Sequence, residues 1–252
     1  MNVTTYILYF FFYSAVGWLM ESLACSGAQK RWINRGFLTG PMCPIYGTGA
    51  VALTVLLTPL RAHPLLVCML GMVITDVVEL ITGILMEKLF HTRWWDYSNR
   101  KYNFMGHICL RNTLYWGIAT LGFMYLVHPV ISLFLGKIPM MAIRVIVAII
   151  LIIFVIDLIA AFKNAADLRK IKDTLKKLYD KFSGVPAGTE ETDEERQELL
   201  NTADTLEDIR EGNRYKKHDP ARILRMNPRI DNEFKRILRD IKRILSDQDE
   251  RY

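Results

Sequence analysis

Charged side chains are scarce in the first 160 residues, which hold only 11 Lys and Arg and 6 Asp and Glu. Residues 161–252 hold 21 Lys and Arg and 20 Asp and Glu. This division excludes a simple soluble enzyme, and the long apolar runs exclude a fully disordered chain. We predict a transmembrane domain at residues 1–161 and a cytoplasmic helical tail at residues 162–252, with a linker at about 183–195.

The chain also lacks paired cysteines and the common catalytic motifs. Its four cysteines form no CxxC pair and lie in or beside apolar segments, so we expect small buried residues and not a secreted disulfide scaffold. No Walker A loop, GxSxG elbow or HExxH motif occurs. Four residues that could in principle bind a metal match no strong zinc pattern: His91, Asp96, His107 and Cys109. We therefore predict no cofactor and no metal.

A basic segment before the first apolar run is missing too. A cleaved signal peptide begins with such a segment, so we expect the first run to be a retained transmembrane helix. The formal charge of +6 divides into +5 for residues 1–160 and +1 for the remainder. The basic balance therefore reflects membrane topology, and we expect no nucleic-acid partner.

Five apolar stretches approach the roughly 20 helical residues that cross a bilayer. They are Tyr6–Ala24, Pro44–Leu60, Leu65–Leu85, Asn112–Leu135 and Ile138–Ala161. The predicted fold is therefore all-α, a polytopic membrane helical bundle. The second stretch is the shortest, and helix breakers crowd its start: Gly40, Pro41, Pro44, Gly47 and Gly49. This density favours a broken or re-entrant start, which a membrane tolerates only where protein or water covers the backbone.

Basic residues are unevenly shared between the loops. The first and third loops carry eight of them, whereas the second carries only Arg61 and the fourth only Lys137. Because positive charge accumulates on the cytoplasmic side, loops one and three should be cytoplasmic. We predict a membrane protein with its N-terminus outside and its C-terminal tail inside.

The tail shows two narrow apolar stripes with helical spacing. The first is Leu168, Ile171, Leu175, Leu178 and Phe182, and the second is Ile230, Phe234, Ile237, Ile241 and Ile244. A weaker helix is expected at about Glu194–Gly212, and Asn227–Pro228 resembles a helix start. The stripes favour a helical hairpin or pairing with a second chain. An amphipathic tail lying on anionic lipid is the alternative.

Several polar residues fall inside or beside the predicted membrane helices. An acid at mid-membrane costs roughly 2.5–3.5 kcal/mol on insertion scales. With the predicted topology, these groups lie in the inner half of the bilayer or at its centre. The candidates for one polar cavity are Glu21, Arg35, Tyr46, Asp76, Glu79, Asp96, Tyr97, Arg111, Asn112 and Asp157. The alternative is a set of structural ion pairs, such as Glu21 or Glu79 with Arg35 or Arg111.

The loop between the third and fourth stretches is rich in aromatic residues. Trp94, Trp95 and Tyr97 are residue types that anchor proteins at the membrane interface. Asp96 lies between them, at the mouth of the predicted cavity. Both an anchoring role and a role in the site are therefore open for this loop.

Several motifs in residues 5–135 resemble a known family. They are GWLME at residues 17–21, NRGFLTGPMCPIYG at 34–47, WDYS at 95–98 and GHICL at 106–110. Together they resemble the bacterial family labelled putative ABC transporter permease, type IV. The resemblance implies a polytopic protein of the bacterial inner membrane. Its hallmark positions would be Glu21, Arg35, Gly36, Gly40, Pro41, Pro44, Tyr46, Gly47, Trp95, Asp96 and Tyr97. Of these, we expect Gly36, Gly40, Pro41, Pro44 and Gly47 to shape the backbone.

Three functions are compatible with these features. The resemblance implies a permease that moves an unknown solute or lipid; it would need a separate ATPase subunit, and a homodimer through the membrane domain or the tail. A membrane-embedded enzyme acting on a lipid or lipid-linked substrate could use Arg35 or Arg111 to bind phosphate, with Glu21, Glu79 or Asp96 as general base. A scaffold whose tail recruits partners is the third. In each case the bilayer itself is a partner.

The predicted topology is tested by cysteine labelling of intact cells that express a cysteine-free variant. A cysteine placed beside Arg31 or Asn99 should stay unlabelled by an impermeant reagent added outside, whereas one beside Arg61 should react. External labelling in the first or third loop would overturn both the topology and the inner-leaflet position of the polar residues.

Overall fold

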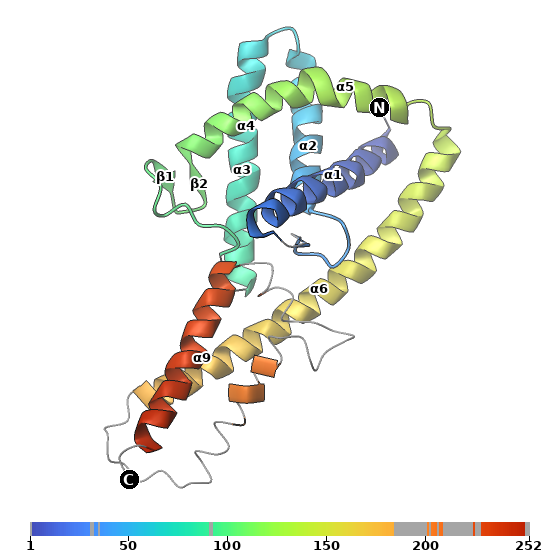
Figure 1. The fold of residues 1–252 in the computed structure, drawn as a ribbon. Helices are drawn as coiled ribbons and strands as arrows, with labels where there is room; N and C mark the ends of the chain where they lie inside the picture. Colours follow the sequence, from blue (N-terminus) through green and yellow to red (C-terminus); the bar gives the residue numbers. More distant parts are fainter. Residues whose placement is uncertain are drawn as a thin grey trace. The chain divides into compact units, whose positions relative to one another are not determined.

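The computed structural model describes residues 2–30, 33–34, 36–90, 93–183, 201, 203–205, 207–208, 224 and 228–249. Helices dominate it (Figure 1): α1 (Val3–Gln29), α2 (Pro44–Leu57), α3 (Pro64–Phe90), α4 (Leu110–Gly122), α5 (His128–Leu135), α6 (Met140–Ser183) and α9 (Pro228–Asp249). Strands β1 (Asn103–Phe104) and β2 (Ile108–Cys109) form a small antiparallel hairpin. The chain divides into two compact units, Met1–Leu158 and Ile159–Tyr252.

Four helical segments in the described part of the chain are long and apolar enough to cross a membrane. They are Val3–Gly27, Pro64–Leu89, Leu110–Leu135 and Met140–Ile171. The predicted all-α polytopic membrane bundle is thereby confirmed. The remaining predicted crossing, Pro44–Leu60, is shorter and ends in a 3₁₀ turn. At 1.5 Å per residue it spans about 25 Å, less than the roughly 30 Å hydrocarbon core.

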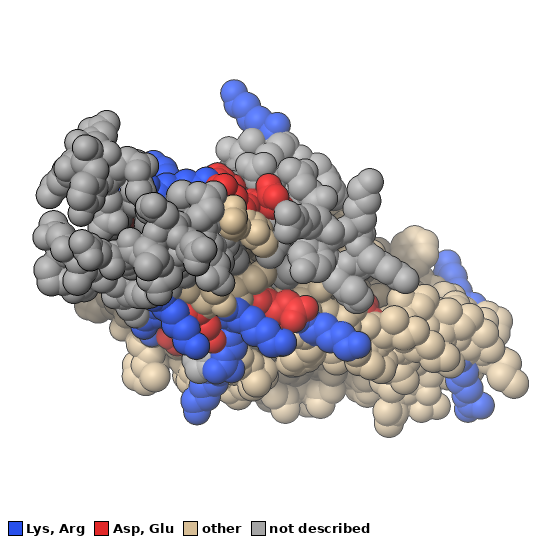
Figure 2. All heavy atoms as spheres, turned by 90° about the horizontal axis from the view of Figure 1, so that it is seen from below, with Lys and Arg blue, Asp and Glu red and all other residues tan. Residues whose placement is uncertain are grey.

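Apolar side chains cover the outside of the long helices. On α3 they recur every four residues and form one exposed stripe: Leu65, Met69, Val73, Val77, Ile81, Leu85 and Leu89. Figure 2 shows a broad area without charged side chains on the face in view. Such a surface is far larger than the apolar patches of soluble monomers, and lipid is the solvent that suits it.

Glycines allow neighbouring helices to approach closely. A Cβ at Gly47 of α2 would collide with the Phe10 carbonyl oxygen and the Ser14 hydroxyl of α1. A Cβ at Gly71 of α3 would likewise collide with Thr120 of α4. Membrane helices lack a hydrophobic drive to associate, so close backbone approach through small residues is a main source of their packing energy. Gly47 was predicted to shape the backbone, but the structure places it in a helix contact.

A π-helical turn, Phe123–Val127, joins α4 to α5. The Arg61 guanidinium donates to the Met124 carbonyl oxygen at 2.8 Å, and the Tyr125 hydroxyl donates to the Arg61 carbonyl oxygen at 2.7 Å. Directly after the π-turn, the Nδ1 atom of buried His128 lies 3.0 Å from the Tyr13 hydroxyl oxygen. These contacts satisfy polar groups at this end of the bundle, where the π-turn interrupts the regular ladder.

The charged part of the chain is also helical where it is described. The last predicted crossing and the first tail stripe, which we treated as separate segments, form one continuous helix, α6. In α9, Phe234 and Ile241 of the second stripe are buried, and Ile237 is half-buried. The predicted linker lies outside the described residues except for Ser183, and only part of the predicted middle helix is described, as helix. The pairing of the stripes therefore stays a prediction.

Replacing Gly47 with Ala tests the close contact of α1 and α2. The added methyl group should destabilise the protein by roughly 1–3 kcal/mol, because the Phe10 backbone cannot move without distorting α1. Gly49→Ala is the matched control, since nothing lies within 4 Å of a Cβ at that position. Thermal unfolding in detergent should show a lower Tm for Gly47→Ala only. Equal Tm values for the two variants would contradict this packing.

Candidate functional site

Glu79 lies on α3 and is buried, with 7% of its surface exposed. Its two carboxylate oxygens accept hydrogen bonds from different elements. Oε1 accepts from the Tyr97 hydroxyl in the loop after α3 at 3.1 Å, and Oε2 accepts from Nε1 of Trp116 on α4 at 3.2 Å. Both donors are neutral, so they orient the carboxylate without cancelling its charge.

Tyr97 connects this carboxylate to the start of α4. Its hydroxyl donates to Glu79 and accepts a hydrogen bond from the Asn112 side-chain amide. Burial, and then the neighbouring Glu79, raise the pKa of Tyr97 above its usual value. The phenol therefore keeps its proton throughout the physiological pH range and remains a donor.

Asp76 lies one turn before Glu79 on α3. Its Oδ2 accepts a hydrogen bond from the Thr113 hydroxyl at 2.7 Å. Its Oδ1 is buried and has no hydrogen-bond partner among the residues that the structure describes. Burying a carboxylate oxygen without a hydrogen-bond partner is energetically costly.

No Lys or Arg of the described ranges forms an ion pair with Asp76 or Glu79. Arg111 was one expected partner, but its guanidinium lies over the Tyr115 ring at 5.5 Å and its side chain is exposed. The other, Arg35, lies outside the described residues. By contrast, Arg93 of this unit pairs with two other acids, Glu87 at 2.7 Å and Asp96 at 3.6 Å, and Glu87 also contacts His107 Nε2 at 3.0 Å.

A third carboxylate, Glu21 on α1, approaches the same region. It accepts a hydrogen bond from the Tyr46 hydroxyl of α2 at 2.9 Å. The Tyr46 ring packs edge-on against Trp116, with ring centroids 6.2 Å apart. Glu21 is thus joined to Glu79 through two aromatic side chains, and α1, α2, α3 and α4 all contribute to one polar cluster.

The structure brings together six of the predicted residues: Glu21, Tyr46, Asp76, Glu79, Tyr97 and Asn112. Our sequence reasoning missed two further members, Thr113 and Trp116. A signal was available for Trp116, which lies four residues after Asn112 on the same face of a helix, and Thr113 in turn lies three residues before Trp116. Whether the cluster lines a cavity stays a prediction.

Asp157 has a different environment. Its carboxylate accepts hydrogen bonds from the backbone N–H groups of Thr39 at 3.0 Å and Gly40 at 2.8 Å. A Cβ at Gly40 would lie 2.9 Å from Oδ2, so this approach favours glycine. Asp157 therefore ties α6 to the segment that precedes α2, and the segment ends where Pro44 begins the helix. Gly36, in the same segment, lies beside Trp18.

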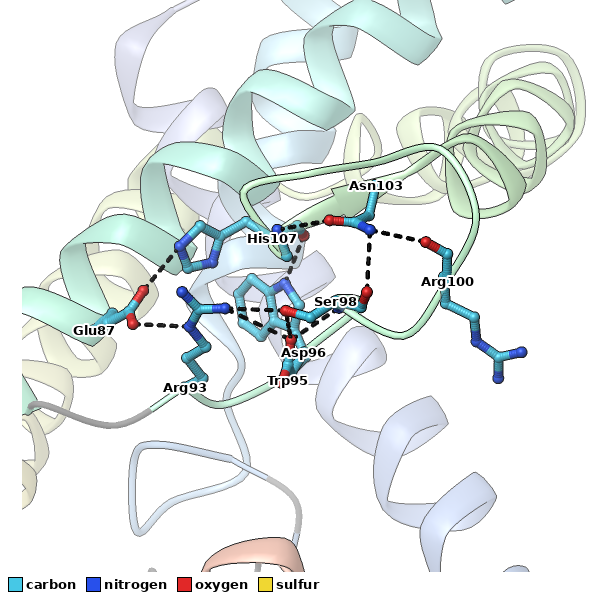
Figure 3. A network of polar contacts seen from close by, with 9 residues as sticks. Glu87, Arg93, Trp95, Asp96, Ser98, Arg100, Asn103 and His107 are labelled. Atoms are coloured by element: carbon cyan, nitrogen blue, oxygen red, sulfur yellow. Dashed lines mark hydrogen bonds and ion pairs between the residues drawn. The ribbon is translucent and has the colours of Figure 1, made fainter.

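Asp96 belongs to a network within the loop between α3 and α4, not to the Glu79 cluster (Figure 3). It accepts from the Ser98 backbone N–H at 2.9 Å and lies 3.6 Å from Arg93. Within the described ranges, no group of three or more His, Cys, Asp or Glu is arranged to hold a metal; His91 lies outside them. Cys109 is buried, and the other three cysteines are half-buried.

Comparison with known proteins gives one match. The model of a family described as putative ABC-transporter type IV matches residues 8–162, more than half of the chain. The matched segment includes every member of the Glu79 cluster, as well as Asp157. No curated protein and no solved structure matches the chain.

Two carboxylate-to-amide replacements should have opposite effects on stability. Asp157→Asn leaves one backbone N–H of the Thr39–Gly40 pair facing an NH₂ group, and should cost about 1–3 kcal/mol. Glu79→Gln also gives up one acceptor, for Tyr97 or Trp116, but it removes a buried charge that has no described cation. The second effect should offset the first, so the free energy of unfolding should stay unchanged or rise. Thermal unfolding in detergent measures both. A large loss of Tm in Glu79→Gln would show that Glu79 belongs to a structural ion pair.

Proposed function

The chain belongs to the putative ABC-transporter type IV family, and on this premise we propose that it is the membrane component of an ABC-type transporter. In this role it moves a solute or a lipid through a cavity open to the cytoplasmic leaflet. The membrane location follows from the family and from the apolar helices. The direction of transport and the chemistry of the substrate go beyond both.

The observation that carries the proposal is the environment of Asp76 and Glu79. Both acids lie well inside α3 and receive only neutral donors from the described residues. A structural role would be served by a nearby Lys or Arg, as at Glu87. Acids kept in a membrane helix without such a partner are typical of ion, proton and solute pathways.

The predicted orientation agrees with the contacts between loops. Phe37 in the first loop and Trp94 in the third have ring centroids 6.2 Å apart, so these two basic loops lie at the same end of the bundle. Asp157 approaches the first loop from α6 at that end. The positive-inside rule makes this the cytoplasmic end, with the N-terminus outside and the tail in the bacterial cytoplasm.

An ABC-type role requires an ATPase that this sequence does not encode, because it contains no Walker A motif. We therefore infer a separate ATPase subunit, with the continuous helix α6 and the charged tail as its contact region. Few crossings are available to enclose a pathway, which supports a homodimer. The contact could form through the membrane unit or through the tail.

An enzyme acting on a lipid-linked substrate is supported less well. Such an enzyme needs a cation to bind phosphate beside its general base. Arg111, the described candidate, is engaged with Tyr115 and makes no described contact with Glu79. A scaffold role would leave without a function the placement in α3 of two acids that have no ion pair among the described residues.

Purification of the full chain in mild detergent tests the proposal. We expect a subunit with a Walker A motif to copurify and to hydrolyse ATP. Glu79→Gln should leave this complex and its Tm intact but abolish growth complementation, because the acid acts on the substrate or its counter-ion. Lys88→Gln, at the end of the same helix, is the control and should keep both properties.

Two results would count against the proposal. Absence of any ATPase subunit from a stable, monodisperse preparation would contradict the ABC-type role. Full complementation by Glu79→Gln would contradict the assignment of this acid to the transport pathway, whatever the partner.

A further inference from the structure

The loop between α3 and α4 presents an exposed surface that the Glu79 cluster does not use. Tyr102, Phe104 and Met105 lie at the β1–β2 hairpin and have 81%, 56% and 58% of their surfaces exposed. Arg100 and Lys101 precede them and are exposed as well. Figure 3 shows the Arg100 side chain directed away from the polar network. Three large apolar side chains beside two cations form what we call the hairpin tip, residues 100–105.

The backbone of the hairpin tip adopts an unfavourable conformation for its residue types. Tyr102 and Met105 have φ angles of 54° and 53°, in the left-handed region that bulky side chains rarely occupy. Met105 and Gly106 are the central residues of the turn, a position where Asn-Gly is the usual pair. Strain of this kind persists only where the surroundings hold it, and it is often found at functional sites.

The hairpin tip is held from its inner side. The Asn103 amide donates to the carbonyl oxygens of Ser98 at 3.2 Å and Arg100 at 2.8 Å. The Tyr97 backbone N–H donates to the Gly106 carbonyl oxygen at 2.8 Å, and Trp95 donates to the His107 carbonyl oxygen at 2.9 Å. These bonds set the direction of the exposed side chains before any partner binds, which lowers the entropy lost on binding.

The position of the hairpin identifies its partner. β2 runs directly into α4, for which Cys109 is the N-cap, and α4 begins a membrane-spanning segment. The hairpin tip therefore lies at the level where the hydrocarbon core gives way to headgroups. Aromatic and Met side chains suit the apolar side of this boundary, and Arg and Lys suit phosphate headgroups. The cations are complementary to an anionic leaflet.

We propose that the hairpin tip is a docking element for anionic phospholipid. Tyr102, Phe104 and Met105 enter the interfacial layer, and Arg100 and Lys101 bind the headgroup phosphates. Tyr97 joins the hairpin to the Glu79 cluster, since its N–H bonds Gly106 and its hydroxyl bonds Glu79. A single residue, Tyr97, therefore links the lipid contact to the proposed transport site, but binding of lipid does not depend on transport.

The test uses the full chain with an environment-sensitive fluorophore at Met105→Cys and its native cysteines replaced by Ser. The protein is reconstituted into vesicles of phosphatidylcholine alone or mixed with phosphatidylglycerol. We expect a blue shift, and quenching by brominated lipid, that are larger in the anionic vesicles. Because both leaflets have the same composition, the result is independent of orientation and of transport activity.

Charge variants identify the interaction. The double variant Arg100→Gln with Lys101→Gln should lose most of the difference in blue shift and quenching between the two lipid compositions. High salt should reduce the same difference in the labelled protein that keeps Arg100 and Lys101. The matched control, Lys176→Gln with Lys177→Gln in α6, should retain it. The proposal would be overturned if the fluorophore stayed in water in both kinds of vesicle. It would also be overturned if only the addition of a soluble protein subunit, and not lipid, shielded the fluorophore from water. Reversal by inorganic phosphate would show a free-anion site instead.

Discussion

Burial of carboxylates in a medium of low dielectric is the constraint on which this membrane unit depends. Each carboxylate on α3 must obtain its hydrogen bonds from other elements, because the α3 backbone is already paired within the helix. Glu79 obtains them from Tyr97 and Trp116, and Asp76 obtains one from Thr113. These bonds fix α4 and the preceding loop against α3. The same groups that make α3 expensive to insert thus help to determine how its neighbours pack.

Polar groups find different hydrogen-bond partners at the two ends of the membrane unit. At the end with the basic loops, Glu21 accepts from the Tyr46 hydroxyl, Asp157 accepts from two backbone N–H groups, and Glu87 pairs with Arg93. At the other end, the π-turn presents a carbonyl oxygen to Arg61, and His128 meets Tyr13. The carboxylates thus lie toward the end with the basic loops, which suits a protein whose two surfaces face different compartments.

Two carboxylates of α3, Glu87 and Glu79, have different environments beside the loop between α3 and α4. Glu87, at the end of α3, pairs with Arg93 and contacts His107, and it anchors the hairpin. Glu79, two turns earlier on the same helix, has only neutral donors among the described residues. Tyr97 belongs to both regions through its backbone and its hydroxyl. It is the residue through which movement of the loop would reach the buried acid.

Sequence alone was sufficient for the all-α membrane class, for the long apolar helices and for six members of the Glu79 cluster, because hydropathy and buried charge are properties of single segments. It could not assign partners. Arg111 was an expected partner for Glu79, yet two neutral side chains occupy that place: Tyr97 of the preceding loop and Trp116 of α4, the helix that also carries Arg111. The sequence also predicted two separate segments where the composition changes from apolar to charged, but the helix α6 continues through this change. Which donor reaches which acid depends on helix register and on glycine contacts such as Gly47, and these exist only once the helices have packed.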